Sequence, residues 1–455
     1  MSTIFIALSY HLLQIPIRKI YKVWIYNIPY NRKYGINKIH IILKMEEKII
    51  IKDMEETNIW WTKDFHNLEY KNRDIDKEIK KFMKTRQIVA ITGLRRVGKT
   101  TLMFKYIREY LEAGFPKQNI FYFSFDDYSS VRISDIIDIY KKLFDKDLRS
   151  EDYFFVFDEI QKIRNWEEQL KRIYDIYPKI KFLISGSESL FIRRKSRESL
   201  AGRIFEFKLN PLNFKEYLEF KNKKFEPPAL YEKDLLKELN NFFMCNGFPE
   251  LIDKEPEIIK KYIREGVIDK ILYHDMSEVF DVKNLVIVRK IFDILYNNPG
   301  QIIELQQFAS EVGINRHLLS EYLEYLEESF LIKKLYNYSR NARKTQRRLK
   351  KYYPTLLNPF LFKDDFSKIF EQAIVIHSNA DFFWRDPYKN EVDIIKTEPL
   401  IAIEVKSGEI KESNLDSLKK FIEKFKPKKT IVISYNIEKE IKGIEIVPAW
   451  KWLLR

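Results

Sequence analysis

Residues 87–104 read QIVAITGLRRVGKTTLMF, and this stretch decides the fold of the first half of the chain. The apolar residues 88–91 predict a short buried strand, and residues 101–106 predict the helix that follows. Between them, Gly93 to Thr100 satisfy the complete pattern G-x-x-x-x-G-K-[ST], in the strand–loop–helix order that phosphate binding requires. The chain has only 12 glycines in 455 residues, so a chance match is disfavoured and we predict a P-loop.

The loop would bind phosphate through its backbone and two side chains. Gly93 and Gly98 let backbone N–H groups turn inward, and the start of the following helix adds a positive field. Lys99 would reach the β- and γ-phosphates, and the Thr100 hydroxyl would bind Mg²⁺. We therefore expect ATP and Mg²⁺ as cofactors, held by Gly93, Leu94, Arg95, Arg96, Val97, Gly98, Lys99, Thr100 and Thr101.

A second buried strand is predicted at residues 153–157 (YFFVF), and it ends in two acids. Asp158 would serve as the metal partner of Thr100. Glu159 would polarise the attacking water. Glu159 and Lys99 are therefore the expected catalytic residues of an ATPase.

Another strand, at residues 180–184, leads into Ser185 and Ser187, either of which could sense the γ-phosphate. A plain Ser/Gly turn explains the same residues. Strands separated by helical stretches predict an α/β fold, here a P-loop NTPase with a parallel sheet over residues 54–230.

The motifs of residues 60–260 resemble archaeal and bacterial AAA-like ATPases that carry a C-terminal winged helix and a nuclease-like region. The matching stretches are ITGLRRVGKTTL, FFVFDEIQKIRNWEEQLKRIYD, FLISGSESL, SLAGRIFEFKLNPLNFKEYL and NGFPE. In that family the SLAGR segment lies close to the nucleotide, so the resemblance implies Arg203 as a γ-phosphate or finger arginine. Whether it would act in its own subunit or a neighbour's stays open, as does a homo-oligomer. A surface salt bridge to Glu206 explains Arg203 equally well.

Residues 231–298 predict amphipathic helices that would form a lid beside the nucleotide domain. Residues 299–340 resemble a winged helix, with Gly313 at the turn and Asn315 as the cap of the second helix. In DNA-binding versions, Asn315, Arg316, His317 and Ser320 would face a groove. A protein-binding winged helix is the alternative, because Glu321, Glu324, Glu327 and Glu328 make the second helix acidic.

The charge balance favours an anionic partner, since 81 Lys and Arg outnumber 66 Asp and Glu and the net charge is +15. Residues 339–353 (SRNARKTQRRLKKYY) place seven of these cations between Arg340 and Lys351, beside the predicted winged helix. We expect DNA as the partner of both segments. A solvated loop without a partner is the alternative.

A second set of chemical residues lies near the C-terminus, where three strands are predicted. Asp393 is followed on the next strand by Glu404 and Lys406, which is the D…E-x-K spacing of a PD-(D/E)xK nuclease. Alternation puts Glu404 and Lys406 on one face, and Asp393 and Glu404 could hold Mg²⁺ while the lysine assists the water. Glu371 matches the helix acid of that fold, which implies a restriction-endonuclease-like α/β domain over residues 341–455. The alternative is that the nuclease-like fold serves only as a scaffold and does not cleave.

The remaining features concern location. Cys245, the single cysteine, excludes an internal disulfide framework and a cysteine zinc site, which fits a reducing cytoplasm. No uncharged apolar run reaches 18 residues, so no membrane association is expected. Residues 1–53 are expected to be a basic tail or an over-extended reading frame, with Met45 and Met54 as alternative starts.

These features are consistent with two candidate functions for the whole chain. The first is an ATPase coupled to DNA binding or processing through the winged helix and the nuclease-like domain. The second is a STAND-type switch, in which ATP drives a conformational change and the nuclease-like domain is catalytically silent.

Overall fold

The computed structural model describes residues 35–63, 65, 70–186, 199–279, 282, 284–341 and 349–455. Its first half is built on a five-stranded parallel sheet of order β2-β3-β4-β1-β5. The strands are β1 (Ile88–Thr92), β2 (Ile120–Ser124), β3 (Tyr153–Asp158), β4 (Ile180–Gly186) and β5 (Ile204–Lys208). The predicted α/β class with a parallel sheet is therefore confirmed.

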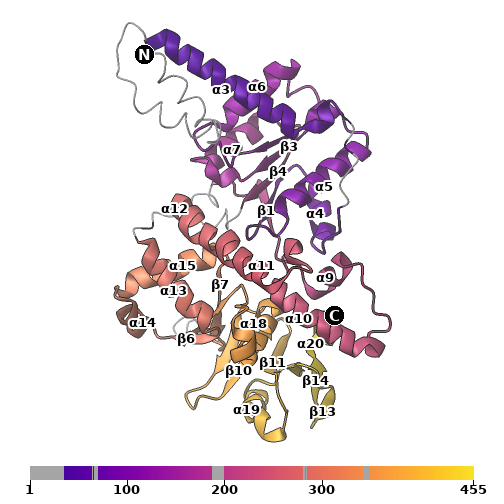
Figure 1. The fold of residues 1–455 in the computed structure, drawn as a ribbon, viewed down its shortest axis with the longest axis vertical. Helices are drawn as coiled ribbons and strands as arrows, with labels where there is room; N and C mark the ends of the chain where they lie inside the picture. Colours follow the sequence, from indigo (N-terminus) through magenta and orange to yellow (C-terminus); the bar gives the residue numbers. More distant parts are fainter. Residues whose placement is uncertain are drawn as a thin grey trace, which may run out of the picture.

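Helices cover both faces of this sheet, which explains why its strands are continuous apolar runs (Figure 1). One face packs against α4 (Asp76–Met83) and α5 (Lys99–Glu112), and the other against α6 (Ile133–Phe144) and α7 (Trp166–Ile176). Alternate residues of each strand enter opposite cores. In β1, for example, Val89 and Ile91 join the α5 side, and Ile88 and Ala90 the α6 side.

The N-terminal boundary expected at residue 53 falls inside a helix, because α3 runs from Gly35 to Thr57 without a break. Ile50 and Met54 on α3 are buried in the core beside α6. Asn58, just after the helix, bonds to both the backbone N–H and the C=O of Tyr122 and so covers the edge strand β2. This part of the predicted tail is thus integral to the domain built on the parallel sheet.

The segment after β5 is helical between the two sheets (Figure 1). It contains α9 (Phe214–Phe220), α10 (Glu232–Cys245), α11 (Pro256–Lys261), α12 (Met276–Val279) and α13 (Leu285–Asn297). Two π-helical stretches, η7 (Tyr262–Ile268) and η8 (Ile271–Asp275), interrupt it beside the P-loop. Mid-helix π-turns are often found at functional sites.

The C-terminal half is built on one continuous nine-stranded sheet, of order β13-β14-β12-β11-β10-β9-β7-β8-β6. Its strands are β6 (Gln301–Ile303), β7 (Ile332–Asn337), β8 (Lys350–Pro354), β9 (Phe382–Arg385), β10 (Glu391–Thr397), β11 (Leu400–Lys406), β12 (Lys429–Ser434), β13 (Lys439–Ile441) and β14 (Ile444–Pro448). Its main helices are α14 (Leu305–Val312), α15 (Arg316–Glu328), α18 (Phe366–Ser378), α19 (Asp416–Phe425) and α20 (Ala449–Leu453).

This sheet crosses the domain boundary expected at residues 340–341. The antiparallel partners β7 and β8 lie on either side of that boundary, and β7 also pairs in parallel with β9. The Asn337 side chain reinforces this seam through both backbone polar groups of Arg385, at 2.8 and 3.0 Å. The two predicted C-terminal domains are therefore joined through one hydrogen-bonded sheet.

None of the helices in the described ranges is long and apolar enough to cross a membrane. The most apolar segment of the sequence, residues 2–17, lies outside those ranges.

Candidate functional site

The P-loop leaves the carboxyl end of β1 and enters α5, and its glycines are required by the local backbone. Gly93 has φ +144°, and a Cβ there would lie 2.2 Å from the carbonyl oxygen of Leu209. Gly98 caps α5 in the left-handed region, at φ +98°. Leu94 and Val97 anchor the loop in the core, while Thr101 is exposed in the first turn of α5.

Lys99 is only 6% exposed and bonds to its own loop. Its Nζ donates to the carbonyl oxygens of Gly93 (3.1 Å) and Leu94 (3.0 Å). Burial lowers the pKa of Lys99, although the charges of Glu159 and Asp158 oppose that shift. The P-loop lysine is thus held inside the concavity where we expect phosphates.

Asp158, at the end of β3, gathers hydroxyl groups from three other elements. It accepts hydrogen bonds from Thr100 (2.7 Å), Tyr122 (3.1 Å) and Ser185. Burial, followed by the neighbouring Glu159 charge, raises the pKa of Asp158, so a cation here would be stabilising. Hydroxyl and carboxylate oxygens suit Mg²⁺, and Thr100 and Asp158 would hold it together with the phosphates of a nucleotide.

Glu159 follows in the left-handed conformation, at φ +52°. Its N–H lies 3.1 Å from Asp158 Oδ1 and 3.3 Å from Ser185 Oγ, and its carboxylate accepts a hydrogen bond from Gln161. The structure therefore brings Glu159, Asp158, Thr100 and Ser185 together at one edge of the sheet. Ser187, the other predicted sensor, lies outside the described residues.

The two arginines of the loop bind the helical segment. Arg95 forms a two-pronged pair with Asp275 of η8, at 2.5 and 2.6 Å, and the Asp275 side chain is 3% exposed. Arg96 lies over the Tyr262 ring and 3.3 Å from Glu250. The P-loop pattern does not reveal Asp275, because the contact spans 180 residues. Both arginines were expected as phosphate ligands, and here both have protein partners.

Arg203 lies away from the P-loop of its own chain, which leaves a neighbouring subunit as the one place where the expected γ-phosphate contact could occur. Its backbone carbonyl accepts from Ile88 N–H, which puts it beside the start of β1, whereas the P-loop follows the end of β1. Five strand residues at about 3.3 Å each separate the two edges. Its guanidinium pairs with Asp175 on α7 (3.0 Å), and Glu206 instead accepts from Thr92 (2.8 Å).

A second polar cluster lies under α18 in the C-terminal sheet, and it contains all four predicted nuclease residues. Glu371 comes from α18, Asp393 from β10, and Glu404 and Lys406 from β11. Lys406 Nζ lies 2.7 Å from Glu404, and Val405 N–H donates to Asp393 at 2.8 Å. Burial, and then the charges of Glu404 and Glu371, raise the pKa of Asp393 well above its usual value.

Lys351 on β8 also lies in this acid cluster, which corrects its expected role in binding DNA phosphates. It is 4% exposed, and its ammonium lies 2.8 Å from Glu371, 2.7 Å from Glu391 and 3.9 Å from Asp393. Lys350, the preceding residue, lies over Tyr336, and Arg340 packs on Phe425. The other four cations of the basic segment fall within residues 342–348, which are outside the described ranges.

The acid cluster does not fit the Mg²⁺ expected on Asp393 and Glu404. Within the described residues, no three His, Cys, Asp or Glu side chains are arranged to hold a metal ion. The Lys351 ammonium supplies the positive charge among the carboxylates. Glu404 Oε2 is buried without a hydrogen-bond partner in the described part, which suits a proton on this carboxyl because burial raises its pKa.

Two short helices joined by a turn, α14 and α15, occupy the segment in which a winged helix is expected. Gly313 ends α14 at φ +81°, and Asn315 caps α15 by accepting from Leu318 N–H at 2.9 Å. Arg316, His317 and Ser320 are exposed on α15. Glu321 and Glu327 are engaged by Tyr325 and Lys334.

Three family matches divide the chain. Residues 85–218 match a family described as "AAA domain". Residues 236–355 and 368–452 match two domains of unknown function, DUF8612 and DUF4143. The first match covers the P-loop and the five strands of the parallel sheet.

Full-length relatives exist in distant organisms. A Methanocaldococcus jannaschii protein, "Uncharacterized protein MJ1544", is 28% identical, and the match covers 92% of this chain and 98% of that protein. A Haemophilus influenzae "Uncharacterized protein" is 27% identical, with coverage of 83% and 97%. The similarity thus extends along nearly the whole length of both relatives.

Among solved structures, AMPPCP-bound DnaA from Aquifex aeolicus matches with a TM-score of 0.27 and 16% identity, covering 58% of this chain and 93% of that one. The clamp loader delta protein of Bacillus subtilis matches with a TM-score of 0.25 and 12% identity, covering 55% and 87%. Scores this low establish neither the fold nor the function of the chain.

Proposed function

We propose that this protein binds Mg²⁺-ATP, hydrolyses it, and couples the reaction to DNA binding through its C-terminal half. The observation that carries the ATPase part is the 2.7 Å hydrogen bond between Thr100 and Asp158. It joins the predicted metal ligands of the P-loop and of β3. A bound Mg²⁺ would neutralise charge on the transferred phosphate.

Each residue of the site has a separate task in this proposal. Lys99 contacts the β- and γ-phosphates, in place of or alongside the loop carbonyls that it now binds. Ser185 and Tyr122 orient the Asp158 carboxylate through hydrogen bonds. Glu159 accepts a proton from the attacking water. Arg203 would reach a nucleotide only in a neighbouring subunit.

The DNA part of the proposal rests on the exposed N-terminal residues of α15 and on the net charge of +15. Arg316 and His317 occupy the helix positions that enter a groove when a winged helix binds DNA. Residues 342–348, which lie outside the described ranges, add four cations to the sequence between β7 and β8. In this proposal the nuclease-like region keeps its fold but does not cleave, because Lys351 lies among its carboxylates.

DNA-dependent ATP turnover by the full chain tests the coupling. We expect duplex DNA to raise the turnover rate severalfold, and Arg316→Gln to reduce the slope of log affinity against log salt by about 1. Arg149→Gln, which removes an exposed arginine far along the sequence, is the matched control. If single-stranded, duplex and branched DNA all leave the ATP turnover rate unchanged, the proposed coupling to DNA is wrong, whereas the proposed ATPase activity still stands.

The second candidate, a STAND-type switch, is favoured by the pair between Arg95 and Asp275. This pair ties the P-loop to the helical segment, and nucleotide phosphates would compete with Asp275 for the same guanidinium. ATP binding would then release η8 from the loop. Such a switch needs a change in shape and no DNA.

Asp275→Asn tests the switch. The substitution leaves the Arg95 charge without its carboxylate, so we expect a lower melting temperature that ATP restores by a larger margin than in the wild type. Asp269→Asn is the control, because Asp269 pairs with Arg289 rather than with the P-loop. Equal ATP-induced shifts in Asp275→Asn and wild-type protein would count against the switch.

A further inference from the structure

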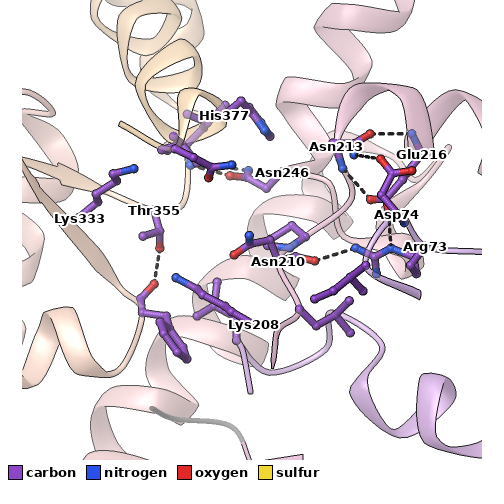
Figure 2. A pocket seen from close by; sticks show the side chains of 18 of the residues that line it. Arg73, Asp74, Lys208, Asn210, Asn213, Glu216, Asn246, Lys333, Thr355 and His377 are labelled. Atoms are coloured by element: carbon purple, nitrogen blue, oxygen red, sulfur yellow. Dashed lines mark hydrogen bonds and ion pairs between the residues drawn. The ribbon is translucent and has the colours of Figure 1, made fainter. Parts of the chain in front are cut away.

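A large cavity lies where the ATPase sheet, the helical segment and the C-terminal sheet meet (Figure 2). Its volume is about 900 Å³, which suits a ligand of nucleotide size. Its walls come from β5 and the loop after it, from α10, from the start of β7 and from the end of α18. Lys99 and Thr100 are not among its lining residues, although Leu94 of the P-loop is.

Two lysines of this cavity form no ion pair with a carboxylate in the described part of the structure. Lys333 of β7 makes no side-chain hydrogen bond or ion pair in the described structure, and Lys208 of β5 has only the Phe330 ring, 4.2 Å from its Nζ. Figure 2 shows both side chains extending into the cavity from separate elements. Burial lowers the pKa of both lysines, that of Lys333 to about 8. Carboxylates of the same wall act on both lysines, since Glu206 and Glu327 partly oppose the pKa shift of Lys208 and Asp381 that of Lys333. Neither lysine forms an ion pair with them in the described structure.

The other charged groups of the wall are already engaged. Arg73 pairs with Glu216 at 3.0 Å, and Lys334 pairs with Glu327 at 2.5 Å. Glu206 accepts from Thr92. Asp74, Glu78 and Asp381 are exposed, and of these three only Asp381 is close enough to raise the pKa of Lys333. An anion entering the cavity would thus find two cations free to bind it.

The apolar part of the wall suits a flat ring. Phe242 packs against His377, with ring centroids 5.1 Å apart, and Phe243 and Phe330 lie on the same lining. Burial lowers the pKa of His377 to about 4, so this imidazole is neutral at pH 7. Aromatic rings beside paired cations are the combination that recognises a base together with its phosphates.

We propose that this cavity is a second ligand site, which binds a phosphate-bearing molecule of nucleotide size with its phosphates on Lys208 and Lys333. Leu209 connects this site to the P-loop, because its N–H donates to Thr92 C=O at 2.8 Å and its carbonyl touches Gly93. An occupant would therefore contact the strand that supports the ATP site.

Calorimetry in the Lys99→Ala background separates this site from the P-loop. The probe is ADP, and adenosine is its phosphate-free match. We expect ADP to bind the Lys99→Ala protein, with adenosine at least tenfold weaker, and affinity for ADP to fall at least tenfold when Lys208→Gln and Lys333→Gln are added. Lys215→Gln with Lys237→Gln, two exposed lysines on α9 and α10, removes the same charge elsewhere and should change nothing.

The proposal is overturned if ADP binds the two Lys99→Ala proteins, with and without Lys208 and Lys333, equally well, or binds neither. Because both substitutions remove buried cations that form no ion pair in the described structure, folding should be kept, and circular dichroism with a melting curve checks this. If the triple variant fails to fold, Lys333→Gln alone with Lys99→Ala gives the same comparison. The outcome does not depend on hydrolysis, so failure of the ATPase proposal leaves this test intact.

Discussion

Glu159→Gln is expected to lower ATP turnover by about 100-fold or more while ATP binding is kept, because a general base contributes on the order of 10²–10⁴ to rate. An amide cannot take the proton of the attacking water, yet it has nearly the same shape as the carboxylate. Glu159 is not a metal or phosphate ligand in the proposed site, so its loss should leave affinity intact. Single-turnover hydrolysis and equilibrium binding of labelled ATP measure the two effects separately.

Two controls make the result specific. Lys99→Ala should weaken ATP binding itself, because it removes the only lysine of the loop and a buried contact with two carbonyls. Glu168→Gln removes an exposed carboxylate of α7 and should leave both quantities unchanged. If Glu159→Gln hydrolyses ATP at the wild-type rate, the base must be another group, and Gln161, which bonds to Glu159, is too weakly basic to replace it.

The nucleotide site could be predicted from sequence because its parts are local. The P-loop is one continuous stretch, and Asp158 ends a strand that the apolar pattern marks clearly. Carboxyl ends of parallel strands meet at one edge, so Thr100 and Asp158 had to approach each other once the sheet was predicted. The hydroxyls of Tyr122 and Ser185 follow the same rule, since their strands flank β3.

The parts that could not be predicted depend on contacts between distant segments. Asp275 reaches Arg95 across 180 residues, and no pattern near Asp275 marks it. The position of Arg203 depends on such a contact, because the resemblance implied closeness to a nucleotide without saying in which subunit. The pairing of β5 with β1 places Arg203 beside the start of β1, at the edge of the sheet away from the P-loop. The same is true of the continuous C-terminal sheet, which is made by pairing β7 with β9 across 45 residues of chain between Tyr336 and Phe382.

Lys351 is the clearest case, because its sequence neighbours suggest a different role. It belongs to a run of cations, which predicts a solvated or DNA-binding segment. In β8, however, alternate residues point to opposite faces, so Lys350 and Lys351 separate: one lies over Tyr336 and the other faces the carboxylates. The number of basic residues in a stretch of sequence therefore does not show which of them are free to bind a partner.

Lys351→Met is expected to destabilise the C-terminal sheet by about 3 kcal/mol or more, because removing one partner of a buried ion pair leaves the other uncompensated. Four carboxylates, Glu371, Glu391, Asp393 and Glu404, would then face only Lys406 and Arg385. Hydrogen exchange of the Val405 amide, which donates to Asp393, measures this loss locally in the full chain. The loss should shrink as the pH falls, because protons would neutralise the same carboxylates.

Lys350→Met provides the matched control on the same strand and should lower stability much less, because this side chain is only half-buried and forms no ion pair in the described structure.

Addition of Mn²⁺ distinguishes a structural ion-pair cluster around Lys351 from a metal-dependent nuclease site. If Lys351 supplies the cation, Mn²⁺ should restore protection to the Lys351→Met protein and leave the wild type unaffected. Mn²⁺-dependent DNA cleavage by the wild type, abolished by Asp393→Ala, would instead mean that Lys351 moves aside for a metal and that the nuclease-like fold is active.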